Sequence, residues 1–128
     1  MTTIPHKLNS RKDEIATSFM ALVDQHMEEL MAGKAKRRMS AVDFAGLLFI
    51  APRHLTNTLK AALGHSPCDV MENRILNEAI KLLNETDLSV ADIAYKFGYQ
   101  EPTNFIKFFK GMNGVTPLQY RKGQKLAS

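Results

Sequence analysis

Residues 40–45 read SAVDFA and residues 89–94 read SVADIA, so one six-residue motif occurs twice, 49 positions apart. A repeat on this scale predicts two copies of one supersecondary unit. The similarity continues beyond each motif, where the spacing grows from 49 to 50, a change that a loop absorbs. The further matching pairs are Leu48 and Phe97, Leu55 and Phe105, Leu59 and Phe109, Lys60 and Lys110, Gly64 and Gly114, Ser66 and Thr116, and Pro67 and Pro117.

Each motif begins with the features of a helix N-terminus. Ser40 and Ser89 carry a hydroxyl that can cap the first turn, and an aspartate follows each of them three residues later. Short helices are therefore expected to start at these serines. The first should end near Leu48 and the second at Gly98, because glycine takes the left-handed conformation that ends a helix at little cost.

A second helix is predicted after each short one. Pro52 and Pro102 suit the first helical position, where no backbone N–H is needed, and a glycine marks the end of each helix. These helices should cover residues 52–62 and 102–112. A short helix, a tight turn and a second helix form the helix-turn-helix motif, whose second helix enters the major groove of DNA.

Two further helix starts combine a hydroxyl residue with a proline. Ser66-Pro67 predicts a linker helix of about 17 residues between the copies, and Thr116-Pro117 predicts a short terminal helix that reaches about Lys122. No segment shows the alternation of a β-strand. The apolar residues at helical spacing in the linker are Val70, Met71, Ile75, Leu76, Ala79, Ile80, Leu82 and Leu83.

An amphipathic helix is expected before the repeat, within residues 11–32. It either packs on the first copy as part of the core, or contributes to a homodimer or receives a signal from a sensor domain. Its apolar residues at helical spacing are Ile15, Phe19, Leu22, Val23, Met27, Leu30 and Met31.

The expected fold is all-α, with two helix-turn-helix subdomains joined by a long linker helix. It has about seven helices, and the N-terminal amphipathic helix precedes them. The expected segments are the N-terminal helix with a basic linker, the first helix-turn-helix, the linker helix, and the second helix-turn-helix with a short C-terminal helix. Their ranges are 1–39, 40–66, 67–84 and 85–128.

The outward faces of the two second helices carry the candidate DNA contacts. Placing the matched apolar residues inward, at 100° per residue, turns mostly polar and basic side chains outward in both copies, with almost no acid among them, and leaves His54 and Asn104 on the flanks. Arginine and lysine can read guanine, asparagine can read adenine, and an isoleucine can meet a thymine methyl. The alternative is a pair of solvated helix faces. The candidates are Arg53, His54, Thr56, Asn57, Lys60, Thr103, Asn104, Ile106, Lys107 and Lys110.

Positive charge is concentrated in the repeat. The formal net charge is +4 and the pI is about 9.3. Residues 1–33 carry a charge of −2, which leaves +6 on residues 34–128. The run Lys34, Lys36, Arg37 and Arg38 either contacts phosphates or forms a solvated loop.

Several functional classes lack their sequence features. No phosphate-binding loop or nucleophile elbow occurs, so an enzyme is not expected. One cysteine and four scattered histidines give no zinc spacing, and no cofactor or metal is expected. No apolar run indicates a signal peptide or membrane span, which favours a cytoplasmic protein. A helical adaptor that binds protein instead of DNA remains the other alternative.

The order of motifs also resembles the DNA-binding domain of the bacterial AraC/XylS-type transcription regulators. The resemblance covers residues 40–121 and includes IAYKFGY, FIKFFK and GVTPLQYR. It implies two recognition helices held about one DNA turn apart on the same face, and contact with RNA polymerase besides double-stranded DNA. Such regulators usually carry an upstream sensor domain, so the chain is either a stand-alone member or a fragment. The base-reading positions of the family correspond to Arg53, Thr56, Asn57, Thr103, Asn104 and Lys107.

Two departures from the family pattern lie in the first copy. Ala51 replaces a serine or threonine that would cap the recognition helix, a loss of about 1 kcal/mol. Gly46 lies inside the preceding helix, where it costs about 1 kcal/mol relative to alanine. The first copy is therefore expected to be the less stable half and the weaker reader of DNA.

Overall fold

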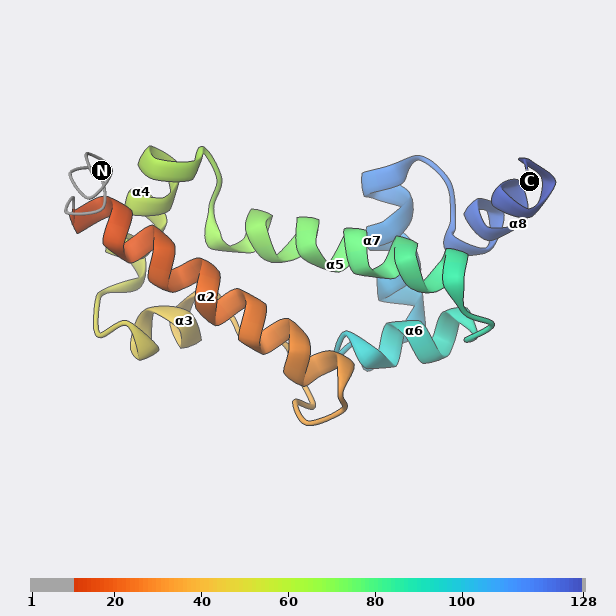
Figure 1. The fold of residues 1–128 in the computed structure, drawn as a ribbon, viewed down its shortest axis with the longest axis horizontal. Coiled ribbons are helices and arrows are strands. Elements are labelled where there is room, and N and C mark those ends of the chain that lie inside the picture. The colour runs from red at the N-terminus through yellow and green to blue at the C-terminus, as the bar shows by residue number, and fades with distance from the viewer. Residues whose placement is uncertain (1–10, 128) are drawn as a thin grey trace, which may run out of the picture. The chain divides into compact units, whose positions relative to one another are not determined.

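The computed structural model describes residues 11–127, and these residues form seven helices and no strand (Figure 1). This confirms the all-α prediction. The first ten residues of the predicted 1–39 segment lie outside the described residues. No helix in the described part is long and apolar enough to cross a membrane. The helices are α2 (Arg11–Met31), α3 (Ala41–Leu47), α4 (Pro52–Leu63), α5 (Pro67–Glu85), α6 (Val90–Lys96), α7 (Pro102–Asn113) and α8 (Pro117–Ala127).

The helices belong to two compact units. Among the described residues, unit 1 comprises residues 11–28 and 39–72, and unit 2 comprises residues 29–38 and 73–127. Each unit contains one helix-turn-helix, α3 with α4 or α6 with α7. The division passes through α2 and α5, so the end of α2 and the loop after it join unit 2.

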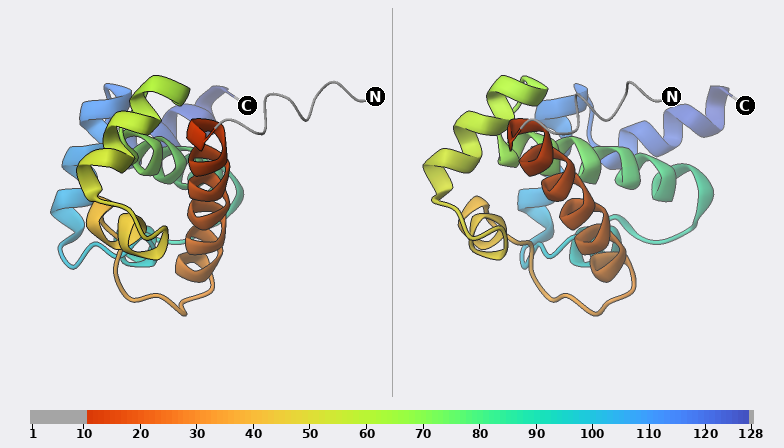
Figure 2. Two further views of the ribbon diagram at one scale, coloured as in Figure 1. Left: turned by 90° about the vertical axis from the view of Figure 1, so that its left-hand side faces the viewer. Right: turned by 60° about the vertical axis from the view of Figure 1, so that its left-hand side comes forward.

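The apolar side of α2 packs into the core of unit 1. Phe19 and Val23 are fully buried, and the Phe19 ring meets the Phe44 ring of α3 edge-on at a centroid distance of 5.1 Å. Figure 2 shows α2, in red to orange, running beside α3. His26 is 3% exposed, and its Nε2 accepts a hydrogen bond from the Met39 N–H at 3.0 Å. The N-terminal helix is therefore part of the core, one of the two expected roles.

The predicted caps of the short helices are present. Ser40 and Asp43 form a capping box, in which the Ser40 N–H donates to Asp43 Oδ2 at 2.8 Å and the Asp43 N–H donates to Ser40 Oγ at 3.3 Å. The Asp92 N–H likewise donates to Ser89 Oγ at 3.0 Å. These hydrogen bonds satisfy N–H groups that have no partner within the helix.

The two short helices end in equivalent Schellman motifs. In α3, the N–H of Ile50 donates to Ala45 O and that of Phe49 to Gly46 O. In α6 the donors are Tyr99 and Gly98. The left-handed position is occupied by Gly98 with φ of 83° in unit 2, but by Phe49 with φ of 59° in unit 1. Phe49 therefore adopts a left-handed backbone conformation that is unfavourable for any residue with a Cβ atom.

The Phe49→Gly variant should be more stable than the wild type by about 1 kcal/mol. Relief of left-handed strain contributes about 1–2 kcal/mol, and the greater freedom of glycine in the unfolded chain removes part of it. Little packing is lost, because Phe49 is 92% exposed. Urea denaturation measures the change, and Phe49→Ala is the control because it removes the ring but keeps the strain. Equal stabilisation by both variants would contradict the strain explanation.

Unit 2 has an aromatic core. Phe105 lies 6.4 Å from Phe97, 5.5 Å from Tyr99 and 6.0 Å from Phe109 between ring centroids. Phe109 also meets Tyr120 of α8 edge-on at 5.8 Å. All of these residues except Tyr120 are buried, so α7 and α8 are held by ring packing.

The linker and terminal helices also begin with capping pairs. Ser66 with Asp69, and Thr116 with Gln119, exchange hydrogen bonds between side chain and backbone N–H. The linker helix spans 19 residues, slightly more than predicted. The prediction that the terminal helix ends at about Lys122 is wrong, because α8 continues to Ala127. One interior glycine, Gly123, costs about 1 kcal/mol, which does not end a helix.

Candidate nucleic-acid interface

The buried side of α4 fixes which residues of this helix face solvent. Leu55 and Leu59 lie one turn apart and are fully buried, and α3 contacts α4. Pro52 occupies the first turn, and Gly64 ends the helix with φ of 79° and an N–H that donates to Lys60 O. Since one side of the helix is held in the core, the opposite side is directed outward.

The same arrangement fixes α7 in unit 2. Phe105 and Phe109 are fully buried, and α6 contacts α7. Pro102 occupies the first turn, and Gly114 has φ of 85° with its N–H donating to Lys110 O. The inward residues predicted from the repeat are thus confirmed in both helices.

The ten predicted contacts form five pairs of equivalent positions, with one member of each pair on each helix. Eight of the ten are exposed, and Thr56 and Ile106 are half-buried. The exposure of eight of these residues agrees with the expected outward orientation, and their contact with DNA stays a prediction. The pairs are Arg53 with Thr103, His54 with Asn104, Thr56 with Ile106, Asn57 with Lys107, and Lys60 with Lys110.

Several of these side chains have donors available to a ligand. Within the part of the chain that the structure describes, the side chains of Arg53, Asn57 and Lys107 take part in no hydrogen bond or ion pair. Lys60 lies near the start of α5. Hydrogen bonds from Ser66 are the main cause that lowers the pKa of Asp69, and the positive charge of Lys60 contributes weakly to it. The outward faces therefore offer cations and amides in both units.

Neither recognition helix has a side-chain cap. Ala51 precedes α4 and Glu101 precedes α7, and neither side chain accepts a hydrogen bond from the first turn. The missing capping oxygen therefore does not distinguish the two copies. The expectation that the first copy is less stable depends instead on Gly46 and on the strained Phe49, and it stays a prediction.

Part of the basic run before the repeat has structural contacts that sequence reasoning missed. The Arg38 guanidinium lies over the Tyr99 ring, 4.3 Å from its centroid, and Arg37 also has a partner within the chain. Lys96 Nζ donates to Met31 O at 3.1 Å. In the sequence, the only feature that could have indicated these contacts was the presence of basic residues in the loop and of a tyrosine, Tyr99, in the second copy.

A family model described as a helix-turn-helix domain matches residues 44–123, which include both recognition helices. The chain belongs to the AraC-type helix-turn-helix family. A relative within this group is YtdP of Bacillus subtilis, an uncharacterised helix-turn-helix-type transcriptional regulator. It is 30% identical over 124 residues, which cover 93% of this chain and 15% of YtdP.

Solved structures show the same fold as this AraC-type chain. The C-terminal domain of AraT, a response regulator from Geobacillus stearothermophilus, has a TM-score of 0.77 and 26% identity, with 89% of this chain and 88% of that domain covered. The DNA-binding domain of AdpA, solved with a target DNA, has a TM-score of 0.74 and 19% identity over 86% of this chain and 95% of that one. The chain spans only 15 to 38% of the length of three curated relatives that it matches.

Proposed function

We propose that the chain binds double-stranded DNA sequence-specifically to regulate transcription, and inserts α4 and α7 into successive segments of the major groove. The five pairs of equivalent outward positions carry this proposal. Each unit has its own core, yet each recognition helix carries hydrogen-bonding or basic groups at equivalent positions opposite its own buried residues. A merely solvated surface does not require that correspondence. Membership of the AraC-type family supports the same function.

The chemistry of each side chain suggests its base preference. Arg53 and Lys107 suit the O6 and N7 acceptors of guanine, and Asn57 suits adenine. Thr56 and Ile106 each hold a methyl group that can contact the thymine methyl. The remaining proposed contacts, to base edges or phosphates, are His54, Lys60, Thr103, Asn104 and Lys110.

Phosphate contacts would supply the affinity that does not depend on sequence. Residues 34–128 carry a net charge of +6. Both recognition helices begin with N–H groups that no side chain caps. Helix N-termini attract anions through these N–H groups and the helix dipole. Affinity should therefore fall steeply with salt, because bound counterions are released from DNA.

Selection from a random duplex library should enrich a site with two short elements about one helical turn apart. Fluorescence anisotropy on that site then measures binding as salt is raised. Asn57→Ala and Lys107→Ala should each weaken binding by about 10- to 100-fold and relax sequence preference in different elements. Lys122→Ala, which removes an exposed lysine outside the recognition helices, is the matched control and should have a much smaller effect.

Two results would contradict the proposal. No enriched sequence, with no binding even at low salt, would exclude DNA as the ligand of this chain. Equal effects of Asn57→Ala and Lys107→Ala on every position of the site would exclude separate reading by α4 and α7. A helical adaptor for a protein partner would give the first result.

A further inference from the structure

Residues 29–38, here called the 29–38 segment, belong to unit 2 and pack against its helix-turn-helix. Lys96 Nζ of α6 donates to Met31 O at 3.1 Å. A Cβ added to Gly98 would lie 3.0 Å from the Arg38 nitrogen and 3.1 Å from the Arg37 Cα. The backbone of this segment therefore lies directly against the turn between α6 and α7, so close that a side chain at position 98 would be crowded.

Arg38 connects the 29–38 segment to the recognition helix through one aromatic ring. Its guanidinium lies over the Tyr99 ring, 4.3 Å from the centroid. The Tyr99 ring in turn lies 5.5 Å from that of Phe105 and 6.3 Å from that of Phe108, and both phenylalanines belong to α7. Tyr99 is buried and Arg38 is half-buried, and a cation over a ring is held more strongly when the pair is shielded from water. Arg38 therefore helps to fix the ring against which α7 packs.

The first copy forms the same turn without such a segment. The Schellman hydrogen bonds are equivalent in the two copies, yet Phe49, the equivalent of Gly98, is 92% exposed. The equivalent of Tyr99 is Ile50, which offers no ring to a cation. Cover by the 29–38 segment is therefore not needed to build a helix-turn-helix of this kind, and its contribution is specific to the second copy.

We propose that Arg38 is a positioning residue for DNA reading by α7 and that it acts through Tyr99. This inference rests on the proposed DNA binding. Lys107, the proposed guanine reader of α7, lies between Phe105 and Phe108 in the sequence. A side chain that reads a base edge must be held to within about 0.5 Å, so a small shift of α7 against the Tyr99 ring costs discrimination. Arg38 precedes residues 44–123, the part of the chain that the family model matches.

Contact with a DNA phosphate is the competing role for an arginine in this basic run. The other cations of the run, Lys34, Lys36 and Arg37, are exposed. Arg38 is half-buried, and its charge lies over a ring. Loss of a phosphate contact weakens binding to every sequence alike and reduces the slope of log affinity against log salt by about 1. Loss of a positioning contact reduces discrimination only in the element that α7 reads, and it leaves the slope unchanged.

Fluorescence anisotropy of full-chain variants, on the selected site and on sites with single base changes in either element, distinguishes these roles. Arg38→Gln should weaken binding about 3- to 10-fold, with the loss of discrimination confined to the α7 element and the salt slope of the wild type. Tyr99→Phe keeps the ring and should bind within about twofold of the wild type. Lys34→Gln is the matched control, because it removes the same charge from an exposed position of the same segment and should leave discrimination in the α7 element unchanged.

A double-mutant cycle tests whether Arg38 acts through Tyr99. Adding Arg38→Gln to Tyr99→Leu should cause less than about a twofold further loss of discrimination, because the ring that Arg38 holds is already absent. Amide hydrogen exchange without DNA shows whether each variant is folded. Exchange in α7 of the Arg38→Gln variant should be about 3- to 10-fold faster, while exchange in α4 is unchanged, because Arg38 and Tyr99 belong to unit 2.

Three results would overturn the positioning role. One is a loss of affinity by Arg38→Gln that is equal for all sequences, with a salt slope lower by about 1, which assigns Arg38 to a phosphate. The others are unchanged discrimination in the α7 element and unchanged exchange in α7. A wild-type chain that binds no DNA contradicts the proposed function itself, and this result is recognised without any variant.

Discussion

The Phe105→Ala variant is expected to lose about 3–5 kcal/mol of unfolding free energy, the typical cost of removing a buried phenylalanine ring. Phe105 is fully buried and lies within 6.4 Å of the rings of Phe97, Tyr99 and Phe109. Removing the central ring leaves a cavity that these neighbours fill only in part. A small domain is stable by about 5–15 kcal/mol, so much of the stability of unit 2 would be lost.

Urea denaturation, monitored by circular dichroism, measures this loss of unfolding free energy. Amide hydrogen exchange shows which helices it affects. Exchange should accelerate in α6 and α7 more than in α3 and α4, because Phe105 belongs to the core of unit 2. Phe108→Ala is the matched control on the same helix. Phe108 is half-buried and lies 6.3 Å from Tyr99, so its loss should cost well under half as much. Equal costs for the two variants would show that burial in the ring cluster is not the source of the stability.

The elements that could be predicted from the sequence are those with local determinants. Ser40 and Ser89 cap helices through atoms three residues away, and Pro52 and Pro102 begin helices because of their own ring geometry. The internal repeat then indicated which residues face inward, because apolar residues recur at equivalent positions in both copies. Helix order and the outward faces followed from these features alone.

The left-handed Phe49 could also have been identified from the repeat. At the spacing of 49 it is the equivalent of Gly98, and a glycine in one copy of a Schellman motif indicates a position where a positive φ is needed. The pattern of apolar residues gives no such information, because phenylalanine there reads as one more apolar residue after Leu47 and Leu48.

Contacts between residues distant in sequence could not be predicted in this way. Arg38 and Tyr99, and Lys96 and Met31, come together only because the end of α2 joins unit 2. The bases read by the protein could not be predicted either, because which bases Asn57 and Lys107 contact depends on how the DNA bends as well as on side-chain chemistry. The sequence therefore indicates which side chains are available, whereas the DNA determines which of them read bases.

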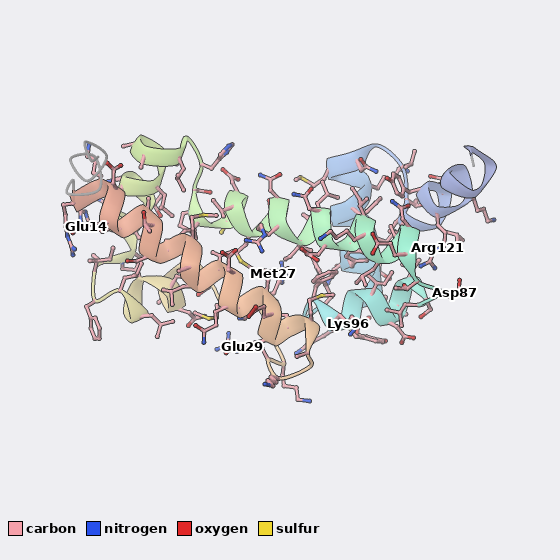
Figure 3. The ribbon with its side chains drawn as sticks, in the orientation of Figure 1. Glu14, Met27, Glu29, Asp87, Lys96 and Arg121 are labelled. Atoms are coloured by element: carbon pink, nitrogen blue, oxygen red, sulfur yellow. The ribbon has the colours of Figure 1, made fainter. Side chains whose placement is uncertain are left out.

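Replacing Arg121 with methionine is expected to lower the unfolding free energy by about 3 kcal/mol. Each hydrogen bond from a charged donor contributes about 1.5–3 kcal/mol, and the loss is smaller than the sum because some of the freed carbonyls form hydrogen bonds with water instead. The Arg121 side chain of α8 reaches the end of α5 and the loop that follows it (Figure 3). Nε donates to Leu83 O at 3.1 Å and Nη1 to Leu88 O at 2.7 Å. Nη2 donates to the carbonyls of Leu82 and Thr86 at 3.5 and 3.2 Å.

Arg121→Lys separates the geometry of the guanidinium from its charge, again by urea denaturation. Lysine keeps the positive charge that the helix dipole favours near the C-terminus of α5, but one ammonium cannot replace a planar fork that bonds to four carbonyls. The lysine variant should therefore lose about half as much unfolding free energy as the methionine variant. The control is Lys122→Met, at an exposed neighbouring residue, which should lower the unfolding free energy by less than about 0.5 kcal/mol. A lysine variant as stable as the wild type would assign the effect to charge alone. If the fork is the cause, its loss frees the loop before Ser89, and DNA reading by α7 should weaken while reading by α4 persists.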